Sequence, residues 1–305
     1  MRHISQLSDV FRLTRLERAQ ALDRVIAPAQ RVVRRLRPGP VRDALNGVWL
    51  GHPLHPVLAQ APVEAWLSAA VLDAARGRGA GPDAARGEAA MARAAVAEAQ
   101  RRRLVAFGLA AAAAAALAGA ADWSEQHEQQ MRVGVVHAAA NVTAAGFYGA
   151  SLLTRKPAAS RALRLAGLAA VTAGSLLGGH ISFRLSGGVN QAEPVPHLVE
   201  PGWHDLMPAA GLGDGEPVRA MLGEVPLVVI RDGRALHVLA GRCSHLSGPL
   251  WEGDLDAGCL TCPWHGSAFR ITDGAVARGP ATAPQPVLRT RVRDGIIQVC
   301  LPGAG

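Results

Sequence analysis

Two short stretches, Cys243-Ser-His245 and Cys262-Pro-Trp-His265-Gly266, decide how the C-terminal third of this chain folds. Each stretch places one cysteine and one histidine in a loop, and sixteen residues lie between His245 and Cys262. Two thiolates and two imidazoles suit an iron–sulfur centre in which histidines replace two cysteines on one iron. The thiolates hold the iron that stays ferric, while neutral imidazoles reduce the negative charge at the other iron and ease electron uptake.

The surrounding residues, from about 198 to 303, resemble a Rieske [2Fe–2S] ferredoxin domain. The resemblance rests on the two ligand loops and on three flanking motifs, Gly248-Pro249-Leu250, Asp273-Gly274 and Gly279-Pro280. It implies an all-β domain over residues 198–305 that binds a [2Fe–2S] cluster through Cys243, His245, Cys262 and His265. Short β-like runs separated by Asp-Gly turns also predict antiparallel strands in this part of the chain.

Structural zinc is the main alternative for four cysteine and histidine ligands. Cys259-Leu-Thr-Cys262 is itself a CxxC pair, but the Cys-x-His spacing sets the first two ligands closer than is usual for zinc. An empty, degenerate site is a further alternative. Cys259 precedes the second loop where a strand should enter it, and Cys300 lies in a strand-like run, so both are expected to be small core residues.

The resemblance also implies which residues tune the cluster. In the respiratory type of this family, a serine after the His-Gly step and a tyrosine two places later bond to the cluster and raise its potential. Ser267 matches the serine, but Phe269 stands at the tyrosine position. The respiratory type joins one extra cysteine from each loop in a disulfide, and here Gly248 or its neighbours and Trp264 take those places. A lower reduction potential and a reducing compartment are therefore expected.

The first 188 residues follow a different pattern. Four apolar runs of about 18–21 residues, near the length that crosses the hydrocarbon core, occupy 57–75, 104–121, 133–153 and 163–183. The fold class we expect is an α-helical four-span transmembrane bundle over residues 48–188, followed by a linker at 189–197 and the all-β Rieske-type iron–sulfur domain. Residues 1–47 are predicted to form a basic amphipathic segment that lies on the membrane surface.

The charge is divided unevenly along the chain. Residues 1–191 carry 23 Lys and Arg against twelve Asp and Glu, whereas residues 192–305 carry nine Arg against twelve acids. A basic block beside apolar spans indicates anionic lipid headgroups as partners rather than nucleic acid. His-Pro-Leu-His-Pro at 52–56 and Asp122-Trp123 make this region similar to an uncharacterised family of four-span bacterial membrane proteins, which implies the architecture and no activity.

Histidines are concentrated near the ends of the predicted spans. An even number of spans returns the chain to its starting side, which places five of them at one membrane face: His52, His55, His127, His137 and His180. His55, His137 and His180 lie nearest the spans and are the preferred candidates. Such histidines could bind haem b through two imidazoles, hydrogen-bond a quinone, hold another metal, or simply bond to backbone carbonyls.

The function that the sequence favours is a membrane-anchored carrier that shuttles single electrons through the cluster, to or from a redox partner protein, a quinone or a haem. A redox sensor, an anchoring subunit, and the ferredoxin component of a multi-subunit oxygenase system are the alternatives. A self-contained oxygenase is disfavoured because only forty residues, with no histidine among them, follow His265. Iron–sulfur clusters are normally inserted in the cytoplasm, so export of this domain would need a twin-arginine signal. Arg34-Arg35 is not followed by an apolar segment and no arginine pair stands before the fourth span, so we expect a multi-pass cell-membrane protein with its Rieske domain in the cytoplasm.

Overall fold

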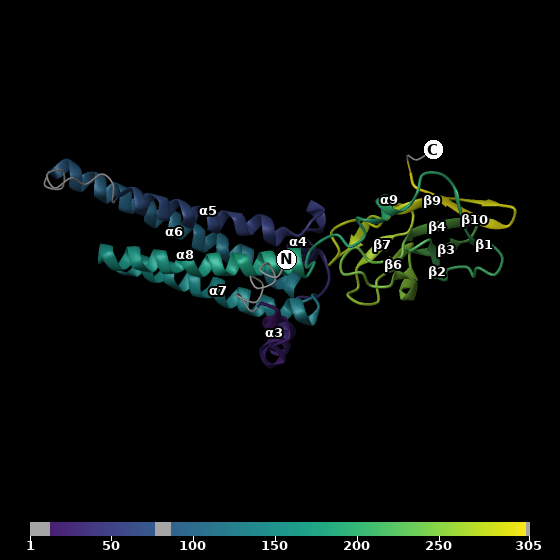
Figure 1. Ribbon diagram of the computed structural model, residues 1–305, viewed down its shortest axis with the longest axis horizontal. Helices are drawn as coiled ribbons and strands as arrows, with labels where there is room; N and C mark the ends of the chain where they lie inside the picture. Colours follow the sequence, from purple (N-terminus) through teal and green to yellow (C-terminus); the bar gives the residue numbers. More distant parts are fainter. Residues whose placement is uncertain (1–12, 77–86, 303–305) are drawn as a thin grey trace, which may run out of the picture. The chain divides into compact units, whose positions relative to one another are not determined.

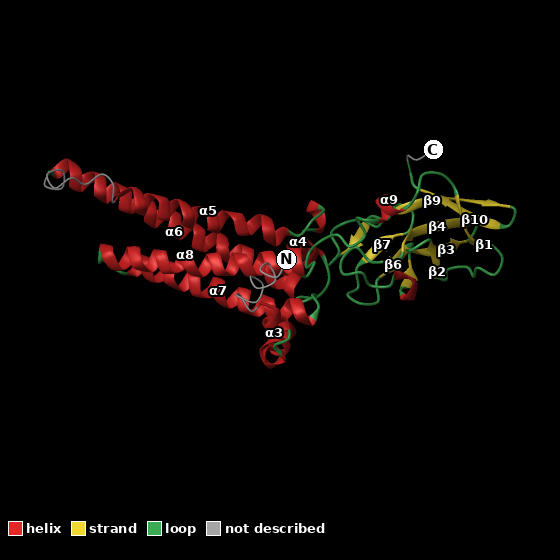
Figure 2. Ribbon diagram, in the orientation of Figure 1, coloured by secondary structure: helices red, strands yellow, loops and turns green. Residues whose placement is uncertain are grey.

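The computed structural model describes residues 13–76 and 87–302, and the chain divides into two compact units. The helical unit comprises Met1–Val33 and Leu54–Ser186. The β unit comprises Arg34–Pro53 and Gly187–Gly305. Figures 1 and 2 show that long helices build the helical unit and that the described strands lie in the β unit.

Four long helices form the core of the helical unit: α5 (Leu54–Arg76), α6 (Glu88–Trp123), α7 (Glu128–Leu153) and α8 (Pro157–Gly179). Each packs against the next, and α8 also packs against α5, so the four make a bundle (Figure 1). Alanine, the residue with the highest helix propensity, dominates the middle of α6. Proline begins α8 at a position that needs no backbone N–H, and a π-helical turn, His180–Arg184, follows it.

Two shorter α-helices are also described in this unit. They are α2 (Leu13–Glu17) and α3 (Asp23–Val33), and both pack against α7. Arg132 of α7 holds them by donating hydrogen bonds to both carboxylate oxygens of Asp23, at 2.8 Å each, and to the Glu17 carbonyl at 3.2 Å. Part of the predicted N-terminal segment is therefore tied to the bundle by a charge pair.

Two described stretches, Ala90–Trp123 and Pro157–Arg184, are long and apolar enough to cross a membrane by length and composition. The four spans expected from the sequence are thus matched only in part. Polar residues such as Glu64 in α5 and Asn141 in α7 lower the hydropathy of the other two helices. All four helices nevertheless expose large apolar side chains, among them Val57, Leu67, Val71, Phe107, Leu117, Val142, Leu165 and Leu176.

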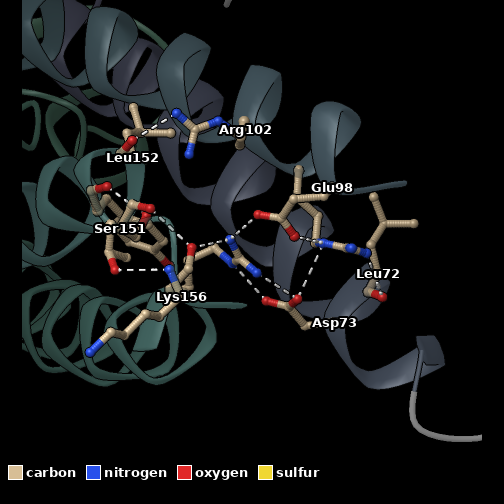
Figure 3. A network of polar contacts seen from close by, with 12 residues as sticks. Leu72, Asp73, Glu98, Arg102, Ser151, Leu152 and Lys156 are labelled. Atoms are coloured by element: carbon tan, nitrogen blue, oxygen red, sulfur yellow. Dashed lines mark hydrogen bonds and ion pairs between the residues drawn. The ribbon is translucent and has the colours of Figure 1, made fainter. Parts of the chain in front are cut away.

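A network of buried ion pairs joins α5, α6 and α8 (Figure 3). Arg164 of α8 donates to both carboxylate oxygens of Asp73 in α5, at 2.7 and 2.8 Å, and to Glu98 of α6 at 3.1 Å. Arg101 of α6 lies 3.3 Å from Asp73 and 3.0 Å from Glu98. Arg101, Asp73 and Arg164 are at most 3% exposed, so their charges depend on one another for stabilisation.

The β unit contains two antiparallel sheets. One has the order β1-β10-β9-β4-β3-β2, and the other has the order β5-β6-β7-β8. The strands are β1 (His204–Pro208), β2 (Val218–Leu222), β3 (Val225–Asp232), β4 (Ala235–Ala240), β5 (Asp254–Asp256), β6 (Cys259–Thr261), β7 (Ala268–Arg270), β8 (Val276–Arg278), β9 (Val287–Arg293) and β10 (Ile296–Cys300). The all-β domain expected from the sequence is therefore present.

Strand β3 separates two buried cores. Successive side chains of a strand point to opposite faces of the sheet. Leu227 and Val229 accordingly enter one core, whereas Val228 and Ile230 enter the other. The second core also contains Phe269 and the two loop cysteines, Cys243 and Cys262.

Two segments outside the strands also belong to the β unit. The expected linker packs Ala192 and Val195 into the first core, and it continues into α9 (Val195–Leu198). Helix α4 (Pro40–Asn46) comes from the predicted N-terminal segment, and Asp43 Oδ1 accepts a hydrogen bond from the Gly279 N–H at 3.0 Å. Local sequence patterns could not show this, because they do not reveal the unit on which a short helix packs.

Candidate metal centre

The two ligand loops have the same backbone hydrogen bonds. In the first loop the Cys243 N–H donates to the Gly248 carbonyl at 2.8 Å, and in the second the Cys262 N–H donates to the Ser267 carbonyl at 2.8 Å. Each cysteine carbonyl then accepts from the residue four places later, Ser247 or Gly266. Both of those residues have positive φ, 62° and 73°, which lets each loop turn tightly back over its cysteine. The sequence motifs thus fold into two equivalent hairpin loops, one after β4 and one between β6 and β7.

These loops bring the four predicted ligands together as two pairs. Cys243 and Cys262 are 1% and 2% exposed and share a side-chain hydrogen bond. His245 and His265 are partly exposed, and their ring centroids lie 5.1 Å apart at an interplanar angle of 88°. In residues 13–76 and 87–302, no three His, Cys, Asp or Glu side chains gather as ligands of a single metal ion would.

The spacing of the imidazole pair fits a shared metal ion. A metal bound by imidazole lies about 2.1 Å from the ligating nitrogen, which puts it roughly 3.2 Å from the ring centroid. Two rings at a tetrahedral angle on one metal are then about 5.2 Å apart between centroids. The observed 5.1 Å agrees with this value. A two-iron unit with two thiolates on one iron and two imidazoles on the other therefore suits the four side chains.

Backbone N–H groups surround the two sulfur atoms. The pKa of Cys262 is lowered to about 7, first by the hydrogen bond from the Cys243 thiol and then by the N–H groups of Trp264 and His265. The same hydrogen bond and burial raise the pKa of Cys243, because together they outweigh the lowering effect of the N–H groups of His245 and Leu246. The backbone N–H groups of both loops thus favour the thiolate, the form in which cysteine binds metal, and at Cys262 this form is favoured overall.

Gln285 fixes the first loop in place, although no local sequence pattern marks it as part of the site. Its side-chain amide nitrogen, Nε2, donates to the Ala240 and Arg242 carbonyls at 3.0 and 2.8 Å, and its Oε1 accepts from the Ser244 N–H at 3.0 Å. The side chain is 2% exposed. A buried glutamine with three such bonds links the segment after β8 to the backbone on both sides of Cys243.

The three residues expected to tune the cluster lie in different surroundings. Ser267 is buried, and its Oγ accepts a hydrogen bond from the Ala281 N–H at 2.9 Å. Phe269 is fully buried in the same core as Cys243 and Cys262. Trp264 is 48% exposed, and it also lies against Gly248, where an added Cβ would be 2.7 Å from Cys262 Sγ.

The preferred membrane-face histidines do not converge on one site. His55 and His137 are close, with ring centroids 6.1 Å apart, and each bonds through Nδ1 to a backbone carbonyl at 2.8 Å. His180 instead contacts Glu17 through Nε2 at 2.9 Å. The sequence could not distinguish these two arrangements, because both depend on which helices lie side by side.

Comparison with known proteins identifies a Rieske [2Fe-2S] domain at residues 202–292. The anthranilate 1,2-dioxygenase ferredoxin subunit of Burkholderia cepacia is 34% identical over 97 residues, which are 32% of this chain and 90% of that protein. Ferredoxin CarAc of Metapseudomonas resinovorans is 36% identical over 78 residues, 26% of this chain and 73% of that protein. A solved complex of reduced oxygenase and oxidized ferredoxin in carbazole 1,9a-dioxygenase shows 31% identity over 33% of this chain and 94% of that chain, with a TM-score of 0.31.

The fold and the paired loops thus define an electron-transfer domain of the Rieske type. The chain belongs to the Rieske [2Fe–2S] family. The matched residues all lie in the β unit, so the similarity of residues 48–188 to a four-span membrane family stays a prediction.

Proposed function

We propose that this protein is a membrane-anchored electron carrier that passes single electrons between a redox partner protein and a partner in the membrane. The observation that carries the proposal is the arrangement of the ligands as a buried thiol pair beside a partly exposed imidazole pair. Cys243 and Cys262 would hold one iron, and His245 and His265 the other. When bound, the [2Fe–2S] cluster supplies one-electron oxidation and reduction.

The cysteine pair and the histidine pair lie in different surroundings, which give them different roles. Burial of Cys243 and Cys262 excludes water from the sulfur side, and backbone N–H groups there offset negative charge. The partly exposed rings of His245 and His265 offer an edge that a partner can approach. A ring N–H on either histidine can release a proton on oxidation, which couples the electron to pH.

Exposed apolar side chains on α5 to α8 support membrane anchoring. Large apolar side chains such as Phe107, Leu117 and Val142 are exposed on these helices, and exposed apolar surface of this kind marks contact with a partner or a membrane. Positive charge in residues 1–191 supports contact with anionic lipid headgroups. We place the protein in the cell membrane with the Rieske domain on the cytoplasmic side, and we expect a quinone or a haem as the membrane-side redox partner.

A second candidate function is the ferredoxin component of an oxygenase system. The relative from Burkholderia cepacia, a dioxygenase ferredoxin subunit, favours it because its sequence match covers 90% of that protein. In this case the β unit would deliver electrons to a separate oxygenase rather than to a group in the membrane.

The test uses the full chain in vesicles that contain anionic lipid. Flotation, a redox titration monitored by electron paramagnetic resonance (EPR), and reoxidation by a membrane quinone would be measured on one sample. We expect the cluster signal to float with the vesicles and to be lost rapidly after quinone is added. A signal that stays in the detergent-free soluble fraction would contradict the anchor. Reoxidation by a Rieske oxygenase component, but never by quinone or haem, would select the second candidate.

A further inference from the structure

The helical unit contains the same hairpin twice, which the sequence alone did not reveal. Helices α5 and α6 form one hairpin, and α7 and α8 form the other (Figure 1). Two layers of side chains repeat between them, one of histidines and one of aromatic rings. Eleven residues, about three helical turns, separate the layers in both hairpins, so each pair of layers lies on one helix face.

The histidine layer has the same hydrogen bond in both copies. His55 Nδ1 bonds to the Ala115 carbonyl on α6, and His137 Nδ1 bonds to the Gly174 carbonyl on α8, each at 2.8 Å. Four residues after each carbonyl stands a glycine. An added Cβ at Gly119 would lie 2.7 Å from His55 Nδ1, and one at Gly178 would lie 3.2 Å from His137 Cε1. A glycine therefore makes room for each imidazole.

The aromatic layer confirms the repeat. Trp66 lies eleven residues after His55, and Tyr148 lies eleven residues after His137. The two rings stack with centroids 4.3 Å apart. Each packs where its partner helix has a glycine, Gly108 or Gly167, and these stand eleven residues before the glycines of the histidine layer. The histidine pair and the aromatic pair thus both lie at the interface between the two repeats.

The hydrogen bonds also determine which nitrogen of each ring is free to bind a ligand. A carbonyl oxygen can only accept, so in a neutral ring Nδ1 carries the proton and Nε2 carries the lone pair. Asn141 Nδ2 lies 3.3 Å from His137 Nε2 and 3.5 Å from its Nδ1, so it is not on the axis of the Nε2 lone pair, and it donates instead to the His137 carbonyl at 2.9 Å. A metal-binding histidine commonly donates its second ring N–H to a backbone carbonyl, as these Nδ1 atoms do. Both rings are therefore oriented as metal ligands are.

The separation of the rings is suitable for one metal between them. With about 2.1 Å from metal to nitrogen, two imidazoles on opposite sides of a metal have centroids roughly 6.4 Å apart. His55 and His137 have centroids 6.1 Å apart and nearly perpendicular planes, at 86°. This value indicates a wide angle at the metal, unlike the value for the His245 and His265 pair. Ligand sites between structural repeats are common in helical membrane proteins.

We propose that His55 and His137 bind one transition-metal centre through their Nε2 atoms, at the interface of the two helical hairpins. The centre is either a haem iron or a bare metal ion, since both use the same imidazole chemistry. Its role as the membrane-side redox partner of the Rieske domain rests on the function proposed above. The metal site itself depends only on the helical unit. His180, held by Glu17, lies outside the site.

The test measures metal and haem in the full chain, expressed with added iron and a haem precursor and purified in detergent. Elemental analysis and a pyridine haemochrome assay are compared for the wild type, His55→Asn, His137→Asn and the matched control His180→Asn. Asparagine retains an N–H donor for the carbonyl but lacks Nε2. We expect one metal per chain beyond the two irons of the cluster. Either site variant should reduce it at least tenfold and leave the Rieske EPR signal unchanged, and the control should retain it. One haem per chain identifies haem iron, and its absence identifies a bare ion.

A measurement on the wild type keeps the test valid if the variants fail to fold. Histidine modification by diethyl pyrocarbonate, mapped by mass spectrometry before and after metal removal, should show metal-dependent protection of His55 and His137. The proposal is overturned if a wild type with its cluster signal intact binds no further metal after titration with hemin, Fe²⁺, Zn²⁺ and Cu²⁺. It is also overturned if both histidines react equally with and without metal. Neither result would affect the cluster signal, so failure here is distinguishable from failure of the proposed carrier.

Discussion

The two histidine pairs of this chain are positioned in opposite ways. His245 and His265 lie in hairpin loops, each within three residues of a cysteine, and their ring spacing suits adjacent positions on one metal. His55 and His137 lie on long helices and are positioned by carbonyls and glycines of neighbouring helices. The ligands of a loop site can therefore be recognised from local sequence. The ligands of a helix site can be recognised only once it is known which helices pack together.

The largest expected effect is at the loop site. Cys262→Ser should abolish the cluster EPR signal, because a hydroxyl does not replace the thiolate that iron–sulfur clusters use. Cys259→Ser is the matched control, since Cys259 begins β6 only three residues away and is not a predicted ligand. EPR spectra and iron content of both variants provide the measurement. Equal loss in the two variants would mean that the CxxC pair, rather than Cys262 with Cys243, binds the metal.

The next effect tests whether the helical unit depends on tertiary contacts. Arg164→Met should destabilise it by about 3–5 kcal/mol, because it leaves the Asp73 carboxylate buried without its bidentate partner. Arg102→Met, at an exposed arginine that donates to the Leu152 carbonyl, is the control and should change stability little. Thermal unfolding followed by helical circular dichroism in detergent measures both. An unchanged midpoint for Arg164→Met would show that the buried network (Figure 3) is dispensable.

A smaller change is expected from Phe269→Tyr. A new hydroxyl near the cluster could donate one hydrogen bond that favours the reduced form, and a bond of about 1.4 kcal/mol corresponds to about 60 mV for one electron. A redox titration of the variant should therefore give a higher potential than the wild type. Phe269 is fully buried, so thermal stability must be compared in parallel. A lower or unchanged potential in a stable variant would show that the residue at position 269 does not set the reduction potential in this way.

The smallest effect concerns the link between α3 and α7. The hydrogen bond from Arg132 lowers the pKa of Asp23 below its ordinary value of 3.8. The carboxylate therefore contributes stability above that value, and the contribution disappears as the pH falls through the lower pKa of the folded state. Asp23→Asn should be slightly less stable than the wild type at neutral pH and equal to it in strong acid. A difference that persists at the lowest pH would point to packing rather than charge.

The β unit could largely be predicted from the sequence because its determinants are local. Short β-like runs, Asp-Gly turns and the two ligand loops predicted an antiparallel domain with paired cysteines and histidines, and the structure contains that fold. Gln285 was missed because its three hydrogen bonds reach backbone positions more than forty residues earlier. No local pattern predicts such a contact.

The helical unit was less predictable because alanine-rich helices look alike in sequence. Five histidines were expected at one face, but only the packing pairs His55 with His137 and places His180 beside Glu17. The eleven-residue repeat was also hidden, since it consists of a histidine, an aromatic residue and two glycines on different helices. Within residues 13–76 and 87–302, two helical stretches meet the length and composition of a membrane span, and the four-span arrangement stays a prediction.

Electron spin echo spectroscopy of the reduced full-length protein is the sharpest test of the assigned cluster ligands. Two imidazoles and two thiolates on a two-iron unit predict a reduced [2Fe–2S] signal that is modulated by two distinct histidine nitrogens. His265→Cys should remove one of these couplings if the variant retains a cluster. A preparation that holds zinc and gives no signal, or a cluster signal without any nitrogen coupling, would contradict the assignment of His245 and His265.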